Sequence, residues 1–221
     1  MKILVTGANG FIGSVIVETL LRNGHDVVAC GRSRKHLSAS AQLEFISIDL
    51  SDAIQADQWK SLIKGVCAVV NCAGILRETN RGDFERIHVD APSALLAACL
   101  DAGTAKFVQV SALGDSADGE FIASKHQFDS HLLQSGLAAT VLRPSLVLST
   151  RGSYGGTSLL RSMASLPFIV FLPEDGKQQV QPVLAEDVAE TVLRCLTPEV
   201  AQGRILDVVG PEVLGLRETL G

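Results

Sequence analysis

Three glycines lie close together near the start of the chain, within the segment TGANGFIG at residues 6–13. Gly7 can take the left-handed conformation that a tight turn needs, and Gly10 lets a ligand approach the backbone because it carries no Cβ. Gly13 allows a helix to pack closely on a sheet, and the free N–H groups at the start of that helix attract anions. The alternative is a glycine-rich turn without a ligand. The spacing favours a pyrophosphate site formed by Gly7, Asn9, Gly10, Phe11, Ile12 and Gly13.

The next apolar run ends in Cys30-Gly31-Arg32, and Arg34 and Lys35 follow closely. In a dinucleotide site of the Rossmann type, an acidic side chain at this point accepts hydrogen bonds from the adenosine ribose hydroxyls of NAD. Arginine cannot accept such bonds, but its planar guanidinium group suits a 2′-phosphate. One alternative is a solvated basic loop. We therefore predict that Arg32 makes NADP(H) the favoured cofactor over NAD(H).

Two further segments follow apolar runs in the same way, namely Asp49-Leu50 and Cys72-Ala73-Gly74. Open α/β sheets bind their ligands at the carboxyl ends of the strands. We therefore expect Asp49 and Leu50 to meet the adenine edge. Asn71, at the end of the apolar run before them, is expected to line the adenosine and pyrophosphate side together with Cys72, Ala73 and Gly74.

Strand-like apolar runs alternate with segments of helical period, which is typical of β-α-β units. The alternation predicts an α/β fold, a Rossmann-type doubly wound parallel sheet with helices on both faces and a small C-terminal substrate-side region. We expect residues 1–150 to form the NAD(P)-binding domain and residues 151–221 to form the smaller region, interleaved with the core. Predicted strands cover residues 2–6, 26–30, 43–48, 67–71, 106–111, 138–143 (stopped by Pro144), 167–172 and 204–209. Predicted helices begin at residues 11 and 185 and cover residues 57–64, 84–101, 121–134 and 158–165.

The composition excludes several classes of protein. The 221 residues are 47% hydrophobic and carry a net charge of -5, which argues against nucleic-acid binding because that needs a basic face. The five cysteines lack a CxxC pair and the histidines are scattered, so we expect reduced core thiols and no metal. The N-terminus lacks a signal peptide and no apolar stretch is long enough to span a bilayer, which predicts a cytoplasmic protein.

Several motifs occur in a fixed order along the chain: TGANGFIG, NCAG, VSALG, FIASK, RPS and DVAE. In this order they resemble the extended and atypical short-chain dehydrogenase/reductases, a superfamily that includes NAD-dependent epimerases and dehydratases. The segments VSALGD, SKHQFD, LRPSLV and QPVLAEDVAE most resemble the sequences of one group within this superfamily. That group is related to the short-chain-dehydrogenase-like accessory subunit of respiratory complex I. The resemblance covers essentially the whole chain.

The resemblance also assigns candidate catalytic residues. Family members that act on carbonyls or alcohols place a tyrosine four residues before a lysine; here the lysine is Lys125, but the tyrosine position holds Phe121. A phenyl ring cannot transfer a proton. Lys125 is expected to hold the nicotinamide ribose, the alternative being an ordinary exposed helix lysine. Ser111 is the candidate hydroxyl, although many members carry it one residue later, where this chain has Ala112.

Other residues have weaker assignments. His88 is expected to pack beneath the cofactor, with a role as replacement base as the alternative. Tyr154, the only tyrosine, could be imagined as a stand-in proton donor, although nothing fixes it near Lys125. Pro144 and Ser145 resemble the family segment that passes the nicotinamide carboxamide.

Three functions follow from these observations. The first is an NADPH-dependent oxidoreductase acting on a quinone-like or unknown small molecule. The second is a nucleotide-binding module without turnover, a structural or redox-sensing component of a larger assembly. Sugar-nucleotide epimerases and dehydratases rank third, because they need the missing tyrosine. Relatives commonly continue beyond the point where this chain stops, so a longer native protein could carry a membrane anchor or join a respiratory assembly.

Overall fold

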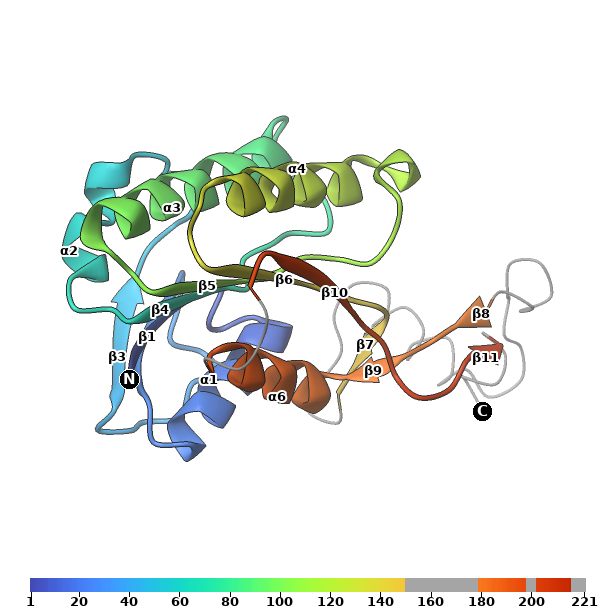
Figure 1. The fold of residues 1–221 in the computed structure, drawn as a ribbon, viewed down its shortest axis with the longest axis horizontal. Coiled ribbons are helices and arrows are strands. Elements are labelled where there is room, and N and C mark those ends of the chain that lie inside the picture. Colours follow the sequence, from blue (N-terminus) through green and yellow to red (C-terminus); the bar gives the residue numbers. More distant parts are fainter. Residues whose placement is uncertain (150–178, 198–201, 216–221) are drawn as a thin grey trace.

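The structure, a computed structural model, describes residues 1–149, 179–197 and 202–215. Its centre is a sheet of seven parallel strands in the order β10-β6-β5-β4-β1-β2-β3 (Figure 1). This architecture confirms the predicted Rossmann-type α/β fold. The strands are β1 Lys2–Thr6, β2 Asp26–Gly31, β3 Leu43–Ser47, β4 Ala68–Asn71, β5 Lys106–Val110, β6 Ala139–Pro144 and β10 Arg204–Val208.

Helices cover both faces of the sheet (Figure 1). Along β1, Ile3 and Val5 belong to the apolar cluster shared with α1 and α6, whereas Leu4 belongs to the cluster on the other face. This alternation explains why the central strands are apolar at nearly every position. On one face lie α1 Phe11–Arg22 and α6 Ala185–Cys195; on the other lie α2 Lys60–Ile63, α3 Ala91–Ala102 and α4 Glu120–Gln134.

The chain reverses its direction of winding between β1 and β4, which pair in the middle of the sheet. β2 and β3 lie to one side of this pair, and β5, β6 and β10 lie to the other. The carboxyl ends of β1 and β4 therefore form a topological switch point, where open α/β sheets bind their ligands.

The smaller elements lie outside the main sheet. Two pairs of short strands form near the carboxyl edge, β7 with β9 and β8 with β11. The short strands are β7 Val147–Leu148, β8 Gln179–Val180, β9 Val183–Leu184 and β11 Leu214–Gly215, and the short helical turns are Ala56–Gln58, Ser116–Asp118 and the π-helical segment Glu85–Asp90 that leads into α3.

Three details differ from the sequence-based expectations. Pro144 is the last residue of β6 rather than the residue that stops it, because a strand end needs no N–H there and the Pro144 carbonyl accepts from Leu113 N at 3.0 Å. Ser111 follows β5 instead of ending it. Leu214–Gly215, where the sequence predicts no strand, forms β11 and pairs with β8.

Some expectations fall on residues 150–178, outside the described part of the chain. These are most of the loop at 149–156 with Tyr154, the helix at 158–165 and the strand at 167–172. Among the described residues, no helix is both long and apolar enough to cross a membrane. Nor do three or more His, Cys, Asp or Glu side chains gather there in a way that could hold a metal ion.

Candidate functional site

The glycine turn lies directly on the switch point. Gly7 has a φ of +63°, which glycine adopts without strain, and its carbonyl accepts from Gly10 N at 2.9 Å. A Cβ on Gly7 would lie 2.8 Å from both Ala73 N and Cys72 O, so the turn rests against the residues that follow β4. A Cβ on Gly13 would lie 2.2 Å from Gly7 O, so the first turn of α1 packs onto the glycine turn itself.

The N-terminus of α1 is open toward the carboxyl edge. Gly10 is its N-cap residue, no side chain caps the helix, and no acidic residue occupies the first turn. The N–H groups of a first helical turn have no intrahelical partner, so they can bind an anion. Gly10 is exposed, and a Cβ there would meet only Gly7 O, at 3.0 Å. Asn9, Phe11 and Ile12 flank this position and are half-buried.

The end of β2 is tied to the glycine turn through Asn9. A Cβ on Gly31 would lie 2.4 Å from Asn9 Oδ1, and Asn9 Nδ2 donates to Ser33 Oγ at 3.4 Å. The intervening Arg32 is exposed. The structure therefore brings the Arg32 backbone next to the glycine turn while leaving its guanidinium group in solvent.

Asp49 and Leu50 follow β3 at the same edge of the sheet. Ile48 N donates to Gly31 O at 3.1 Å, which holds this segment against the end of β2. Asp49 is exposed, and its Oδ1 accepts from the N–H and the hydroxyl of Ser51 at 3.1 and 2.9 Å. Leu50 is half-buried.

A buried ladder of polar side chains crosses the strands below the switch point. Thr6 Oγ1 donates to Asn71 Oδ1, and Asn71 Nδ2 donates to Gln109 Oε1 at 2.7 Å. Asn71 Oδ1 also accepts from Ala73 N at 3.3 Å. All three side chains are buried, so the ladder fixes the end of β4, against which Gly7 packs.

Lys125 lies between the ends of β4 and β5. Its ammonium group donates to Ala73 O at 3.1 Å and to Val110 O at 3.2 Å, and only 5% of the residue is exposed. A Cβ on Gly74 would lie 3.0 Å from Lys125 Nζ, so the glycine makes room for the amine. Burial lowers the pKa of Lys125 to about 8. Lys125 is therefore a buried group at the carboxyl edge and not an exposed helix lysine.

His88 lies in the π-helical segment before α3, with 2% of the residue exposed. Its Nε2 accepts from Ile75 N at 3.0 Å, so the proton of the neutral ring is assigned to Nδ1, which donates to Ser124 Oγ at 2.8 Å. Ser124 Oγ in turn donates to Phe121 O at 3.1 Å. Burial, reinforced by the nearby Lys125 charge, lowers the pKa of His88 to about 3. With both ring nitrogens occupied, His88 is poorly suited to act as a base.

Phe121 joins an aromatic cluster at the start of α4. Its ring centroid lies 5.7 Å from that of His88 and 6.3 Å from that of Phe84. No proton donor takes the place of the missing phenol within this cluster of three rings.

Ser111 follows β5, and Pro144 is the last residue of the neighbouring strand β6. The Ser111 hydroxyl donates to Asp129 Oδ2 on α4 at 2.8 Å, so its proton is directed into the interior. Asp129 Oδ2 also accepts from Arg143 Nε and Nη2 at 3.2 and 3.1 Å. Pro144 is buried, and Ser145 N donates to Val208 O at 3.1 Å. The Ser145 hydroxyl donates to Gln181 O.

Sequence reasoning missed three residues that organise this edge: Gln109, Ser124 and Asp129. A polar side chain at an inward position of an apolar strand, as in KFVQV, is the signal that could have found Gln109. Asp129 lies four residues after Lys125, a spacing that places both on one face of a helix.

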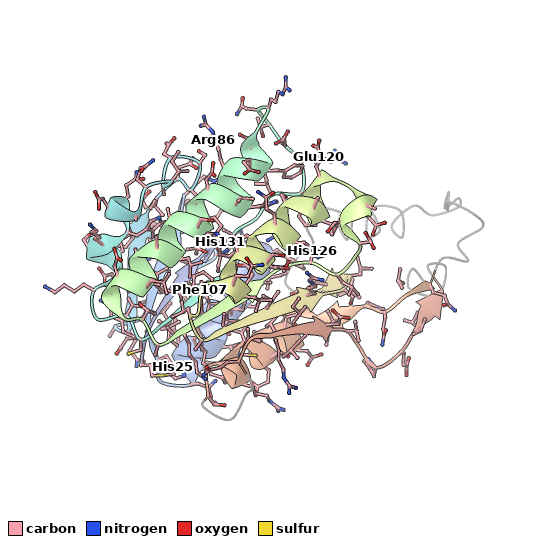
Figure 2. The ribbon with its side chains drawn as sticks, turned by 45° about the horizontal axis from the view of Figure 1, so that its top comes forward. His25, Arg86, Phe107, Glu120, His126 and His131 are labelled. Atoms are coloured by element: carbon pink, nitrogen blue, oxygen red, sulfur yellow. The ribbon has the colours of Figure 1, made fainter. Side chains whose placement is uncertain are left out.

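A cavity of about 350 Å³ lies elsewhere, at the amino-terminal edge of the sheet, and Cys67, Lys106 and Leu193 are among its lining residues. It is also lined by His25, which Figure 2 shows on the side of the molecule away from Glu120 at the start of α4. The cavity is therefore separate from the carboxyl edge that holds the candidate site.

Comparisons with known proteins agree with this architecture. The rice divinyl chlorophyllide a 8-vinyl-reductase is 28% identical over 230 residues, an alignment that covers 95% of this chain and 54% of the rice protein. Mouse NADH dehydrogenase [ubiquinone] 1 alpha subcomplex subunit 9 is 26% identical, with 94% of this chain and 56% of the mouse protein covered. The chain spans about half the length of these curated relatives.

Solved structures show the same fold at lower identity. The UDP-glucose 4-epimerase of Thermotoga maritima superposes with a TM-score of 0.84 at 19% identity, covering 100% of this chain and 80% of that one. Bordetella bronchiseptica WbmH, solved in complex with NAD⁺, gives a TM-score of 0.80 at 21% identity, covering 99% and 78%. The profile of the NAD dependent epimerase/dehydratase family matches residues 3–208. With this match over nearly its whole length, the chain belongs to the NAD dependent epimerase/dehydratase family.

Proposed function

We propose that the chain binds NADPH across the switch point and acts as an oxidoreductase of atypical type. The observation that carries the proposal is the uncapped N-terminus of α1, with its glycine turn packed against the end of β4. The pyrophosphate fits above Gly10, where no side chain intervenes. The adenosine half then extends over the ends of β2 and β3, and the nicotinamide half extends over the ends of β4, β5 and β6.

The preference for NADPH rests on Arg32. Its exposed guanidinium group follows β2 beside the glycine turn, within reach of a 2′-phosphate on the adenosine ribose. Asp49, the carboxylate at the end of β3, already binds the N–H and hydroxyl of Ser51 through Oδ1. Charge-assisted hydrogen bonds from Arg32 would favour the phosphorylated cofactor.

Bound NADPH supplies a hydride. Lys125 would hold the nicotinamide ribose through the ammonium proton that is not bound to Ala73 O or Val110 O, and Pro144 and Ser145 would flank the carboxamide. Because Phe121 cannot donate a proton, the substrate must be one that needs little acid assistance, such as a quinone-like acceptor. The names of two relatives, a vinyl-reductase and a subunit of NADH dehydrogenase [ubiquinone], both refer to redox chemistry, and the second includes a quinone.

The proposal also assigns separate roles to two regions of the chain. Residues 1–150 would bind the cofactor, and residues 151–221 would supply the substrate side while α6 and β10 complete the core.

A binding module without turnover is the second candidate. It is favoured by the polar groups near Phe121, because the protons of His88 and Ser111 are committed to Ser124 and Asp129. The mouse relative is named as a subunit of a larger assembly, which is the setting such a module would have. An epimerase or dehydratase is third, since the family includes such enzymes but Phe121 lacks the hydroxyl.

Calorimetric titration of the wild-type protein with NADPH tests the proposal, with Gly10→Val as the critical variant. The Gly10 backbone has an ordinary φ of -76°, so valine should leave the fold intact while its side chain fills the place of the pyrophosphate. We expect at least a hundredfold loss of affinity, roughly 2.7 kcal/mol or more. Ala102→Val, at an exposed position in the last turn of α3, is the matched control. Unchanged NADPH affinity in folded Gly10→Val protein would exclude the glycine turn as the site.

A further inference from the structure

Asp129 is a carboxylate in the interface between α4 and the sheet, and none of its surface is exposed. It is held by groups from two strands, because Ser111 follows β5 and Arg143 belongs to β6. All three of these hydrogen bonds end on Oδ2. Among the described residues, Oδ1 is buried without a hydrogen-bond partner. A buried carboxylate is costly unless neighbouring charges offset it, so the unpaired oxygen calls for a further electrostatic partner.

The charge of Lys125, one helical turn before Asp129 on the same face of α4, opposes the rise in the Asp129 pKa that burial causes. The two residues bind consecutive positions of the chain, since Lys125 donates to Val110 O and Asp129 accepts from Ser111. Both are buried, so solvent screens the attraction between them only weakly.

The other titratable groups around Lys125 supply no negative charge. Cys72, which follows β4, stays a neutral thiol because burial raises its pKa to about 12. His88, in the segment before α3, stays neutral because burial lowers its pKa to about 3. Arg143, on β6, is a cation that binds Asp129. Asp129 is therefore the only anion around Lys125 in the part of the chain that the structure describes.

We propose that Asp129 is a positioning residue for Lys125, whose buried carboxylate keeps the Lys125 amine charged and so able to donate charge-assisted hydrogen bonds to the dinucleotide. The contact with the dinucleotide rests on the proposed function. The charge coupling between the two residues does not, since it is a property of the protein without ligand.

The direction of the pH dependence follows from the surroundings of Lys125. Burial lowers the pKa of Lys125 to about 8, and the Asp129 charge opposes that shift. Lys125 is thus a cation below about pH 8 and a neutral amine above it. Without the Asp129 charge the pKa falls further, so the amine loses its proton at a lower pH. Neutral donors form weaker hydrogen bonds than charged ones, so NADPH affinity should fall as the pH rises through this range.

The first experiment measures the charge without any cofactor. Lysine labelled with ¹³C at Cε is titrated by NMR, and Lys125→Arg identifies the Lys125 signal by its absence. We expect a midpoint near pH 8 in wild type, a lower midpoint in Asp129→Asn, and a midpoint restored toward wild type in Asp129→Glu. Asp101→Asn removes an exposed carboxylate from the end of α3 and should leave the midpoint unchanged. Identical midpoints in wild type and Asp129→Asn would overturn the proposal.

A wild-type measurement covers the case in which Asp129→Asn does not fold. Aspartate labelled with ¹³C at Cγ should show one buried carboxyl signal that moves with the Lys125 midpoint, and this movement should vanish in Lys125→Arg. A set of carboxyl signals without any inflection at the Lys125 midpoint would show that the two residues are not coupled.

The second experiment measures NADPH affinity by fluorescence between pH 7.0 and 9.5. We expect wild type to bind roughly tenfold more weakly at the upper limit, and Asp129→Asn to show the same loss at lower pH. A profile that is flat in wild type, or identical in both proteins, would overturn the role in cofactor binding. Absence of NADPH binding at every pH, with the NMR midpoints shifted as expected, would instead reject the proposed function and leave the charge coupling standing.

Discussion

The two halves of the candidate site differ in composition, since one is made mainly of backbone groups and the other of side chains. The proposed adenosine half consists of backbone, the glycine turn from Gly7 to Gly10, with the exposed cation Arg32 at its border. The nicotinamide half consists of buried side chains in contact with one another: Lys125, His88 and the Ser111–Asp129 pair. A backbone cradle binds any dinucleotide phosphate, whereas a side-chain network determines what can happen to the bound molecule.

Because of this difference, a protein of this fold can lose its catalytic proton donor and still keep the groups that bind the cofactor. Replacing a tyrosine by Phe121 leaves the glycine turn and Lys125 untouched, because neither depends on a phenol. The aromatic cluster of Phe84, His88 and Phe121 fills the space with rings and donates no proton toward the edge of the sheet. The comparison thus predicts that substitutions in the second half change the chemistry, whereas substitutions in the first half change the affinity for the cofactor.

The largest effect is expected from Phe121→Tyr. The substitution adds a hydroxyl one helical turn before Lys125, in a cluster that already accommodates the ring. A positioned general acid contributes about a hundredfold to ten-thousandfold in rate, so we expect NADPH-dependent reduction of simple ketones to rise about a hundredfold or more above the wild-type background. Ala112→Ser should add to this by supplying a second donor. The measurement is NADPH oxidation across ketone, aldehyde, nucleotide-sugar and quinone acceptors.

Phe84→Tyr is the matched control, since it adds a phenol to the same cluster from a residue outside α4. It should leave ketone reduction at the wild-type level. Rapid ketone turnover by the wild-type protein would contradict the comparison, because another group would then have to supply the proton. A wild-type protein that is inactive with every acceptor, quinones included, would favour the binding module.

A smaller effect is expected on the adenosine half from Arg32→Asp. Charge-assisted hydrogen bonds to a 2′-phosphate are worth roughly 1.5 to 3 kcal/mol, or about one to two decades in affinity. Wild type should therefore bind NADPH more tightly than NADH, and Arg32→Asp should reverse the order. Arg34→Asp changes the same charge two residues later and should preserve the order. Equal affinities for the two cofactors in wild type would show that Arg32 is an ordinary surface cation.

The two halves also differ in how far the sequence predicts them. The glycine turn is local, so its conformation and position before α1 follow from a few residues in a row. The fold follows from the alternation of strands and helices, which is also a local signal. The contacts of this half with a dinucleotide remain predictions, which binding measurements test.

The nicotinamide half could be predicted only in part, because its contacts join residues far apart in the chain. Lys125 was identified from a motif, but its bonds to Ala73 O and Val110 O join it to residues 52 and 15 positions away in the chain. The Ser124 hydroxyl that binds His88 lies 36 residues from it. Such pairings depend on the order of strands in the sheet, which no local pattern specifies.

The smallest effect is expected where the two halves meet, at the ladder of Thr6, Asn71 and Gln109. Gln109→Met keeps the volume and removes the oxygen that accepts from Asn71 Nδ2, leaving a buried donor without a partner. Such a loss costs about 1 to 3 kcal/mol, which for a chain of this size lowers Tm by roughly 2 to 4 °C for each kcal/mol. Because the ladder lies beneath both halves, the ratio of NADPH to NADH affinity should stay at its wild-type value. Differential scanning calorimetry and cofactor titration measure the two quantities, with Gln127→Met on the exposed side of α4 as the control. A Tm equal to that of wild type would show that Asn71 finds another acceptor, and a changed cofactor ratio would show that the halves are coupled through the sheet.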